Sequence, residues 1–438
     1  EYPKEQERGY ASNEDLYVPG YFEMNIKKGE SIIFAASTSE TKTGGLKKLF
    51  DKEVDLRAPR DNFFHCLVNA AHQFHYRTKK DERYIIAGYP WFKCRARDTF
   101  ISLPGLTLSI EEQDYFELVM KTAERDLRNF MEGKPLTGKI TEMEQPDVPL
   151  WAIWAIQQYG KEAGKEQCQK MYGKLLQDIV DYIIAQKHPN LTLEENGLLH
   201  TEGRDKAVTW MNSTANGKPV VPRTGYIVEF NALWYNALRF AASMAQDEKR
   251  VKMLEERAEL AKTSFVDVFL NEYGYLFDYV DGNMMDWSVR PNMIFAVALD
   301  YSPLSQPQKK SVLDVCTREL LTPKGLRSLS PKSGGYNPIY VGPQVQRDYA
   351  YHQGTAWPWL GGFYMEACLK LYKRTRLSFI ERQMVGYEDE MSYHCLGTIS
   401  ELFDGNPPFS GRGATSFAMN VGEILRTLEL LEKYQYQF

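Results

Sequence analysis

Carboxylates, arginines and aromatic rings are the side chains of this 438-residue sequence that could do chemistry, and many of them lie in irregular segments. The longest such segments span residues 188–228, 271–289 and 322–352. Stacking rings, planar donors and two opposed acid/base groups are what a site needs to bind neutral polyols and cleave acetals. Because loops this long in a compact domain usually carry function, we expect the three segments to border one site.

Other chemistries lack their sequence signatures. The chain has no phosphate-binding GxxxxGK[ST] loop, no GxGxxG after a strand, no HExxH helix and no GxSxG elbow. Its six cysteines form no CxxC pair and have no zinc-finger spacing, a pattern typical of reduced thiols in a cytoplasmic protein. We therefore expect no bound metal and no cofactor.

The composition is that of a globular protein, with 43% hydrophobic and 25% charged residues. The 53 Lys and Arg residues and 58 Asp and Glu residues give a net charge of −5. This balance provides no basic face, so we expect no nucleic-acid partner. No apolar run approaches the ~18–20 residues that cross a bilayer, so we expect no membrane partner either. Nothing in the sequence predicts an oligomeric state.

Helical periodicity dominates from residue 61 onward. Asp61 is expected to cap the first helix, and Ser109 to Glu112 have the pattern of a capping box. About a dozen helical stretches are predicted, at 61–77, 97–108, 111–131, 147–159, 164–187, 229–245, 248–270, 291–299, 306–321, 354–373, 377–388 and 416–435. With no strand alternation between them, an all-α fold is expected, either a solenoid or a closed toroid of helix pairs. The absence of a sequence repeat disfavours the solenoid.

Residues 1–60 differ from the rest of the chain. Residues 21–36 alternate around Lys27, Lys28 and Gly29, which predicts a β hairpin. Two strands alone are marginal in water, so we expect the hairpin to be what remains of an N-terminal β domain. Residues 37–60 are expected to be a linker, and 61–438 the catalytic domain. The chain begins at Glu1 without Met, so we expect it to be a piece of a longer protein.

Several blocks, in order along the chain from about residue 84 to 426, resemble the glucosidase half of glycogen debranching enzymes. Residues 7–36 also resemble the segment that joins the β domain of that family to its catalytic domain. The matching blocks are 87–92, 97–106, 147–151, 209–211, 222–223, 228–235, 290–292, 325–329, 347–355 and 399–405. The resemblance implies an (α/α)6 toroid, related to glucoamylases and trehalases, that hydrolyses α-1,6-glucosidic branch points of glycogen or limit dextrin with inversion.

By this resemblance Glu401 matches the general base, which deprotonates the attacking water. The alternative for a lone Glu is a solvated charge near the start of a helix. Arg97 and Asp98 match a pair that holds the terminal glucose through its outer hydroxyls. The alternative for these two is a local ion pair.

The matching blocks contain further candidate substrate-binding residues. His352 is expected to be a hydrogen-bonding pocket residue, not a metal ligand. The tryptophans are candidate stacking platforms, with about two of the five expected in the core. The other polar groups either contact substrate or fasten loops through salt bridges. The candidates are Trp91, Asp147, Trp151, Trp210, Arg223, Glu229, Trp234, Arg290, Asn292, Arg327, Arg347, Gln353 and Trp357.

The sequence departs from the family where the proton donor is expected. The family has an Asp after Trp-Met, and this chain has Asn212. An amide donates a hydrogen bond but has no proton to give to the leaving oxygen, a loss of about 10²–10⁴-fold in rate. If the proton comes from elsewhere, Glu229 and Asp205 are the first candidates. The alternatives to a debranching glucosidase are a non-catalytic or weakly active α-glucan-binding relative, and a toroid glycosidase for another oligosaccharide.

Overall fold

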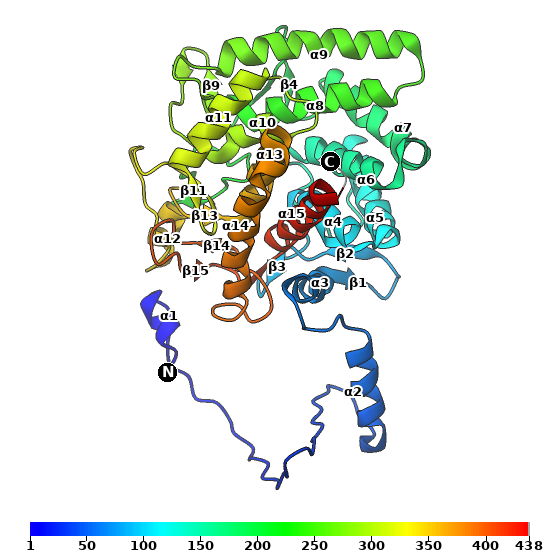
Figure 1. Cartoon of the computed structure of the whole chain (residues 1–438), viewed down its shortest axis with the longest axis vertical. Helices are drawn as coiled ribbons and strands as arrows, with labels where there is room; N and C mark the ends of the chain where they lie inside the picture. The colour runs from blue at the N-terminus through cyan, green and yellow to red at the C-terminus, as the bar shows by residue number, and fades with distance from the viewer. Residues whose placement is uncertain (437–438) are drawn as a thin grey trace.

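The structure, a computed structural model, describes residues 1–436 and is built mainly from helices (Figure 1). All the stretches with helical periodicity are helical within a few residues of the expected bounds. The long helices are α3 (Phe63–Phe74), α4 (Ala96–Thr107), α5 (Gln113–Met131), α6 (Val148–Ala163), α7 (Lys165–Ile184), α8 (Val228–Met244), α9 (Glu248–Phe269), α11 (Gln306–Glu319), α13 (Pro358–Tyr372), α14 (Leu377–Glu390) and α15 (Ala418–Tyr436). The shorter ones are α1 (Pro3–Glu7), α2 (Leu46–Asp55), α10 (Phe295–Ala298), α12 (Gln344–Ala350) and the 3₁₀ turns η1 (Thr43–Gly45), η2 (Leu108–Ile110), η3 (Pro291–Ile294) and η4 (Lys373–Arg376).

Two helix starts differ from the expected ones. Asn62, not Asp61, caps α3, because its side chain accepts the backbone N–H of His65 at 2.8 Å. The capping box expected at Ser109 does not form, and the Ser109 hydroxyl instead donates to Glu429 at 2.5 Å. The 3₁₀ turn η2 occupies that segment, so α5 begins only at Gln113.

Short strands that the sequence did not predict also lie between the helices. Each strand is two or three residues long, too short for an alternating pattern to show in the sequence. One antiparallel sheet has the order β10 (Met284–Met285), β9 (Tyr279–Asp281), β8 (Gly225–Ile227), β5 (Leu199–Thr201), β4 (Thr192–Leu193). A second has the order β11 (Leu321–Thr322), β12 (Gly325–Arg327), β13 (Ala356–Trp357), β14 (Leu402–Phe403), β15 (Gly411–Arg412). Three pairs complete the set: β1 (His75–Arg77) with β2 (Arg83–Ile85), β3 (Gly88–Tyr89) with β16 (Ser416–Phe417), and β6 (Thr214–Ala215) with β7 (Lys218–Pro219).

The two larger sheets bring distant parts of the chain together. Pairing of β8 with β9 places Ile227 opposite Tyr279, so the segment before α8 lies against residue 278. Pairing of β13 with β14 places Ala356 opposite Phe403, so the segment before α13 lies next to Glu401. Five of the residues singled out from the sequence lie at or within two residues of the ends of these strands: Arg223, Glu229, Arg327, Trp357 and Glu401.

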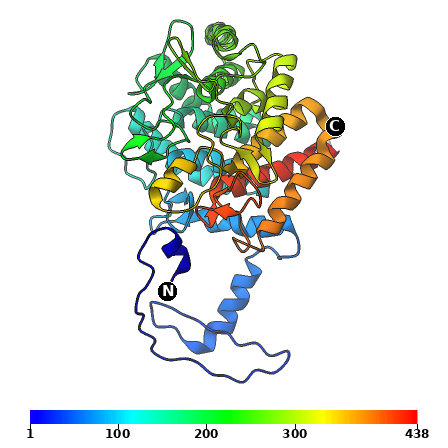
Figure 2. The same ribbon diagram turned by 90° about the vertical axis from the view of Figure 1, so that its left-hand side faces the viewer.

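The hairpin expected over residues 21–36 does not form. Between α1 and η1 the chain has no helix or strand, and nearly all its side chains are exposed. The physical reason is that no further strand within residues 1–436 pairs with the segment, and two strands alone gain little. The stretch expected to be a linker contains α2, and Figures 1 and 2 show both parts outside the helical body.

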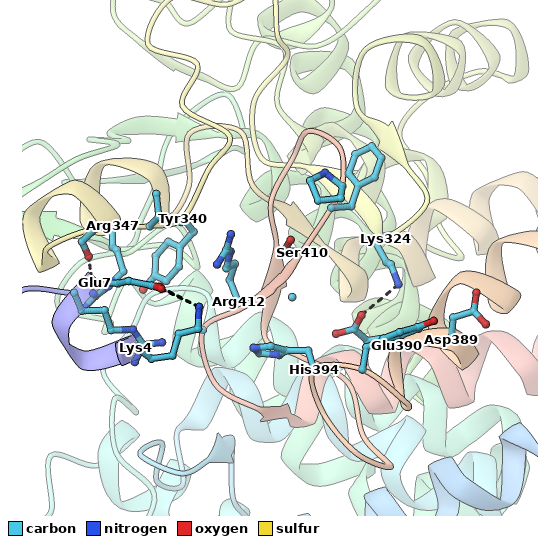
Figure 3. A pocket seen from close by; sticks show the side chains of 18 residues that line it. Lys4, Glu7, Lys324, Tyr340, Arg347, Asp389, Glu390, His394, Ser410 and Arg412 are labelled. Atoms are coloured by element: carbon cyan, nitrogen blue, oxygen red, sulfur yellow. Dashed lines mark hydrogen bonds and ion pairs between the residues drawn. The ribbon is translucent and has the colours of Figure 1, made fainter. Parts of the chain in front are cut away.

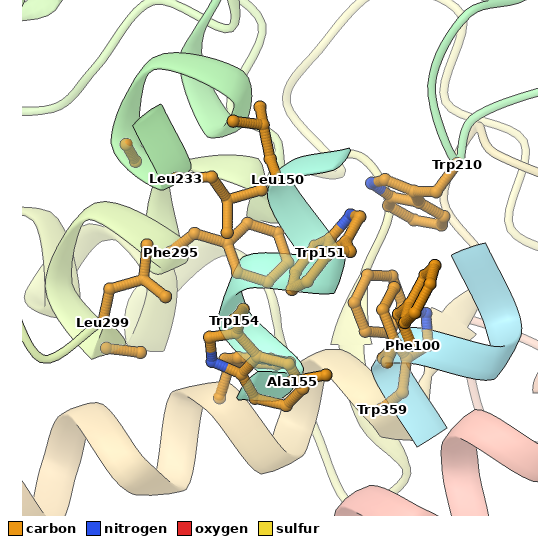
Figure 4. Packing of buried hydrophobic residues seen from close by; sticks show 14 of the residues in the cluster. Phe100, Leu150, Trp151, Trp154, Ala155, Trp210, Leu233, Phe295, Leu299 and Trp359 are labelled. Carbon is orange, nitrogen blue, oxygen red and sulfur yellow. The ribbon is translucent and has the colours of Figure 1, made fainter. Parts of the chain in front are cut away.

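Aromatic side chains fill the centre of the helical body (Figure 4). Trp151 and Trp154 of α6 contact Phe363 of α13, with ring centroids 6.0 and 5.4 Å apart. Helices α4 and α15 cross so closely that a Cβ on Gly105 would lie 1.8 Å from the Gly422 carbonyl oxygen. No helix within residues 1–436 is long and apolar enough to cross a membrane.

Candidate active site

Glu401 lies directly before β14, and three groups hold its carboxylate and backbone. Its backbone N–H donates to the Ala414 carbonyl at 2.9 Å, and the Ala414 N–H donates to Glu401 Oε2 at 2.7 Å. The Tyr351 hydroxyl donates to the other oxygen, Oε1. The absence of a side chain at Gly413 leaves space for the Glu401 carboxylate, because a Cβ there would lie 2.3 Å from Oε2. The side chain is therefore fixed in one orientation.

The environment of Glu401 makes its carboxyl ready to exchange a proton near neutral pH. The residue is only 1% exposed, and burial raises its pKa to about 8. The hydrogen bond from Ala414 and the charge of Arg95 oppose this rise, and the charge of Asp98 adds to it. A carboxyl with a pKa this high titrates where most enzymes work, which is a property of catalytic acids and bases. The solvated helix-terminal charge considered for Glu401 does not occur.

Four aromatic side chains beside Glu401 form a ring cluster: Trp210, Tyr351, His352 and Trp357. The His352 ring stacks on Trp357, with centroids 5.2 Å apart, and meets Trp210 edge to face at 5.0 Å. Neither nitrogen of His352 has a hydrogen-bond partner among residues 1–436. Burial, together with the charge of Arg290, lowers the pKa of His352 well below its usual value, so the imidazole is neutral. A neutral imidazole offers one donor and one acceptor, and here both are free.

Arg97 and Asp98 are both buried, but each is paired with another residue. Arg97 donates from Nε and Nη2 to the two oxygens of Asp147, at 2.6 and 2.8 Å. The Trp151 indole N–H donates to the same carboxylate at 3.2 Å. Asp98 accepts from Arg95 at 3.0 Å, which leaves its second oxygen available. Both residues are therefore ion-paired, Asp98 locally with Arg95 and Arg97 with the distant Asp147, and Asp98 keeps acceptor capacity close to Glu401.

Arg223, Glu229 and Asn292 meet at Asp278, a residue that the sequence did not single out. Arg223 donates to Asp278 Oδ2 at 2.6 Å and Oδ1 at 3.0 Å, and it forms a second two-point pair with Glu229. The Asn292 amide donates to Asp278 Oδ1 at 2.7 Å and accepts the Trp210 indole N–H at 2.7 Å. These groups are buried and saturated, so they fasten the loops that hold Trp210.

Four other polar candidates also fasten loops. Arg290 donates to the carbonyl oxygens of Ser328 and His352, at 3.1 and 2.9 Å, and to the Gln353 side chain at 2.8 Å. Arg327 donates to the Gly405 carbonyl at 2.8 Å. Arg347 donates to the Tyr10 hydroxyl at 2.7 Å, which ties the segment after α1 to α12.

The tryptophan candidates divide by exposure. Trp151 and Trp234 belong to the core, the latter with its N–H donated to the Gly197 carbonyl at 3.2 Å. Trp210 and Trp357 are buried within the ring cluster. Trp91 is 52% exposed, so it lies at the surface. More of the five are buried than the sequence predicted.

Asn212 is partly exposed on a segment that its neighbours fix firmly. The Met211 sulfur lies 3.8 Å from Arg290 Nη1, and the Ser213 hydroxyl donates to the Asp348 carbonyl at 2.6 Å. Trp210 belongs to the ring cluster. The Trp210, His352 and Glu401 segments thus meet at the ring cluster.

Sequence reasoning missed Glu142. Its backbone has φ = 61°, uncommon for a residue other than glycine. Burial raises its pKa, while the charges of Arg95 and Arg97 oppose the rise and that of Asp98 adds to it. No local pattern marks this carboxyl, because its neighbours lie about 45 positions earlier in the chain.

A cavity of about 1060 Å³ opens beside the loop that follows Glu401 (Figure 3). Its lining includes Gly413, which adjoins the Glu401 carboxylate, and Tyr340, whose ring lies 5.5 Å from that of Tyr351. Burial and the charge of Glu401 raise the pKa of Tyr340 to about 12. The opposite wall comes from α1. Hydroxyl and charged groups of this kind suit a polyhydroxylated ligand.

Residues 68–426 match the protein family described as Amylo-alpha-1,6-glucosidase, and residues 1–33 match the family described as Glycogen debranching enzyme N terminal. A glycogen debranching enzyme from Saccharomyces cerevisiae is 23% identical over 382 residues. That match covers 64% of this chain and 25% of the yeast protein, so the chain spans about a quarter of that relative.

Two solved structures from Thermus thermophilus share the fold. An uncharacterized conserved protein has a TM-score of 0.59 and 14% identity, and the match covers 83% of this chain and 99% of that one. A GH63 mannosylglycerate hydrolase, solved in complex with glucose, has a TM-score of 0.58 and 11% identity, with 84% of this chain and 99% of that one covered.

Proposed function

The chain belongs to the amylo-alpha-1,6-glucosidase family, and on that premise we propose that it hydrolyses α-1,6-glucosidic branch points of a glycogen-like α-glucan with inversion. The observation that carries the proposal is the buried Glu401 carboxyl, which Tyr351 and Ala414 hold in place and whose pKa burial raises to about 8. In this role Glu401 takes a proton from water, which attacks the anomeric carbon from the face opposite the leaving oxygen.

The ring cluster supports sugar binding next to this base. Trp210 and Trp357 pack against His352, whose ring has an unpartnered donor and an unpartnered acceptor. Hydroxyl groups of a terminal glucose satisfy such groups, while buried polar atoms without partners are costly. Asp98 and the exposed Trp91 are further contacts in this proposal.

The group that would protonate the leaving oxygen is missing from its expected position. Asn212 occupies the position that resembles the acid, and its amide has no proton to give. The two carboxyls first considered instead fit poorly, because both oxygens of Glu229 accept from Arg223 and Asp205 is exposed. Glu142 fits better, since burial and the charge of Asp98 raise its pKa. We propose slow hydrolysis, with any residual proton transfer through Glu142.

The fold and domain assignments that accompany this function are also proposals. The succession of helices from α3 to α15 supports a closed (α/α)6 ring as the fold of the domain at residues 61–438. The match of residues 1–33 to an N-terminal debranching family supports residues 1–60 as the connection to a preceding domain. The six unpaired cysteines support a cytoplasmic location.

Asn212 favours a second candidate, a non-catalytic or weakly active glucan-binding relative. A third is a toroid glycosidase for another oligosaccharide, favoured by the fold shared with a mannosylglycerate hydrolase.

Incubation of the chain with a branched limit dextrin, linear maltooligosaccharides, trehalose and mannosylglycerate separates the three. We expect glucose from the limit dextrin alone. Binding of the dextrin without release of glucose would identify the second candidate, and turnover of another sugar the third.

A further inference from the structure

Two histidines and a glutamate converge where α3, β1 and α5 meet, on a different part of the molecule from the sheet that holds Glu401 (Figure 1). His72 lies in the last turn of α3, His75 begins β1, and Glu112 is the N-cap of α5. One possible ligand atom from each lies within 4.8 Å of the other two. His72 Nε2 is 2.6 Å from Glu112 Oε1, and His75 Nδ1 is 3.8 Å from Glu112 Oε2.

Second contacts fix the orientation of His75. Its Nε2 lies 3.1 Å from the Leu106 carbonyl oxygen, which can only accept, so this nitrogen carries the hydrogen. The lone pair is then on Nδ1, which faces Glu112. The Tyr115 ring stacks on the imidazole with centroids 3.9 Å apart and holds its plane. A histidine that donates its second N–H to a carbonyl is the usual arrangement of a metal ligand.

The local charges favour a cation here. The ion-pair partners of the Glu112 carboxylate are His72 and His75. A second group with suitable atoms, Glu390, His394 and Cys395, differs in this respect. Lys324 already lies 3.4 Å from Glu390 there, and its charge repels a metal ion.

We propose that His72, His75 and Glu112 bind one zinc ion. Two imidazole nitrogens and one carboxylate oxygen are three of the four ligands that tetrahedral Zn²⁺ takes, and water completes the set. The side chains of His72 and Glu112 are 36% and 35% exposed, so the ion has a path from solvent and a position for that water. The 2.6 Å contact lengthens to about 3.3 Å when both atoms bind zinc at ~2.0–2.1 Å in tetrahedral geometry.

The ion joins the end of α3 to the start of α5. Because it binds the folded chain and not the unfolded one, it stabilises this corner of the helical body. The site shares no residue with the proposed glucosidase site, so it stands whether or not the chain hydrolyses glucan.

Calorimetric titration of the metal-free chain with zinc alone tests the proposal. We expect one equivalent to bind, with an increase in Tm of about 3 °C when free zinc is a hundredfold above Kd. His72→Asn, His75→Gln and Glu112→Gln should each weaken binding at least tenfold and remove the Tm increase. Cobalt in place of zinc should give the visible absorption of a four-coordinate ion, lost in the same variants.

Matched controls distinguish this site from others. His65→Asn changes another histidine of α3, and His394→Asn changes the second group; both variants should bind zinc as the parent chain does. If His75→Gln fails to fold, the half-exposed His72→Asn gives the same comparison. Absence of zinc binding at micromolar concentration, binding that survives all three ligand variants, or binding lost in His394→Asn would overturn the proposal.

Discussion

The Glu401 carboxyl is the residue on which the proposed chemistry depends, and its burial has a direct consequence for pH dependence. A base must be ionised to accept a proton, and the raised pKa keeps most Glu401 side chains protonated at pH 7. We therefore expect kcat/KM on limit dextrin to rise with pH and level off above pH 8. Glu401→Gln should lose at least 10³-fold in kcat and keep its affinity for glucan, because ring stacking needs no charge.

Glu255→Gln, an exposed carboxylate on α9, is the matched control and should change neither quantity. If Glu401→Gln kept most of its kcat, another carboxyl would be the base.

Asn212 provides a second test at the same scale. Replacing its amide by the nearly isosteric acid in Asn212→Asp should raise kcat on natural glucan about tenfold or more, since the leaving oxygen then receives a proton. The gain should be smaller with an acidic phenol as leaving group, because such a group departs unaided. Rate measurements on both substrates give the comparison.

Asn216→Asp, an exposed neighbour on the same loop, should leave both rates unchanged. A parent chain that is already fast on limit dextrin, and slower after Asn212→Asp, would be the contrary result. Loss of that activity in Glu142→Gln would then identify the donor.

The residues of the candidate site could be predicted from the sequence better than the residues that they pair with. Glu401, Trp210 and His352 were placed in one site from the blocks that contain them, and the structure brings these blocks together. The fastening role of Arg223 could not be predicted, because Asp278 is 55 positions away and meets it only through the pairing of β8 with β9.

At the scale of elements, helices were predictable and strands were not. A long helix such as α5 repeats its apolar face often enough to be recognised. A two-residue strand such as β14 has no period, and its existence depends on partners from other parts of the chain. The predicted hairpin over 21–36 failed for the converse reason, since a local alternating pattern needs partners to become a sheet.

The crossing of α4 and α15 gives a prediction for helix packing. Gly105→Ala should lower the free energy of unfolding by about 3 kcal/mol or more, because the new methyl group would lie 1.8 Å from the Gly422 carbonyl oxygen and force the helices apart. Denaturant unfolding measures the change. Gly44→Ala, where nothing lies within 4 Å, is the control and should change stability little. Equal stability of the two variants would mean that the helices do not cross this closely.

For the whole molecule, buried charges in the core set the response to acid. Arg426 of α15 pairs with Glu366 of α13 at 2.7 Å, and Lys370 also reaches Glu366 at 2.8 Å. Burial acts to raise the pKa of Glu366, but the charges of Arg426 and Lys370 outweigh it and the pKa is lowered. A lowered folded-state pKa stabilises the protein above the unfolded value, near 4.5, and this stabilisation is lost as the pH falls below it.

Glu366→Gln should therefore lower the free energy of unfolding by about 3–5 kcal/mol at pH 7 and by less at pH 3. Unfolding curves across this pH range give the measurement. The exposed Glu255→Gln should follow the parent chain at every pH. A Glu366→Gln curve parallel to that of the parent would show that this carboxyl does not respond to acid as described.

The anomeric form of the glucose released from limit dextrin tests the proposed mechanism most directly. Attack by a Glu401-activated water from the face opposite the leaving oxygen converts an α-linkage into β-glucose. We expect proton NMR of the early reaction to show β-glucose above the Glu401→Gln background, followed by slow mutarotation to the α form. Early α-glucose, or no glucose above that background, would contradict the proposed inverting glucosidase.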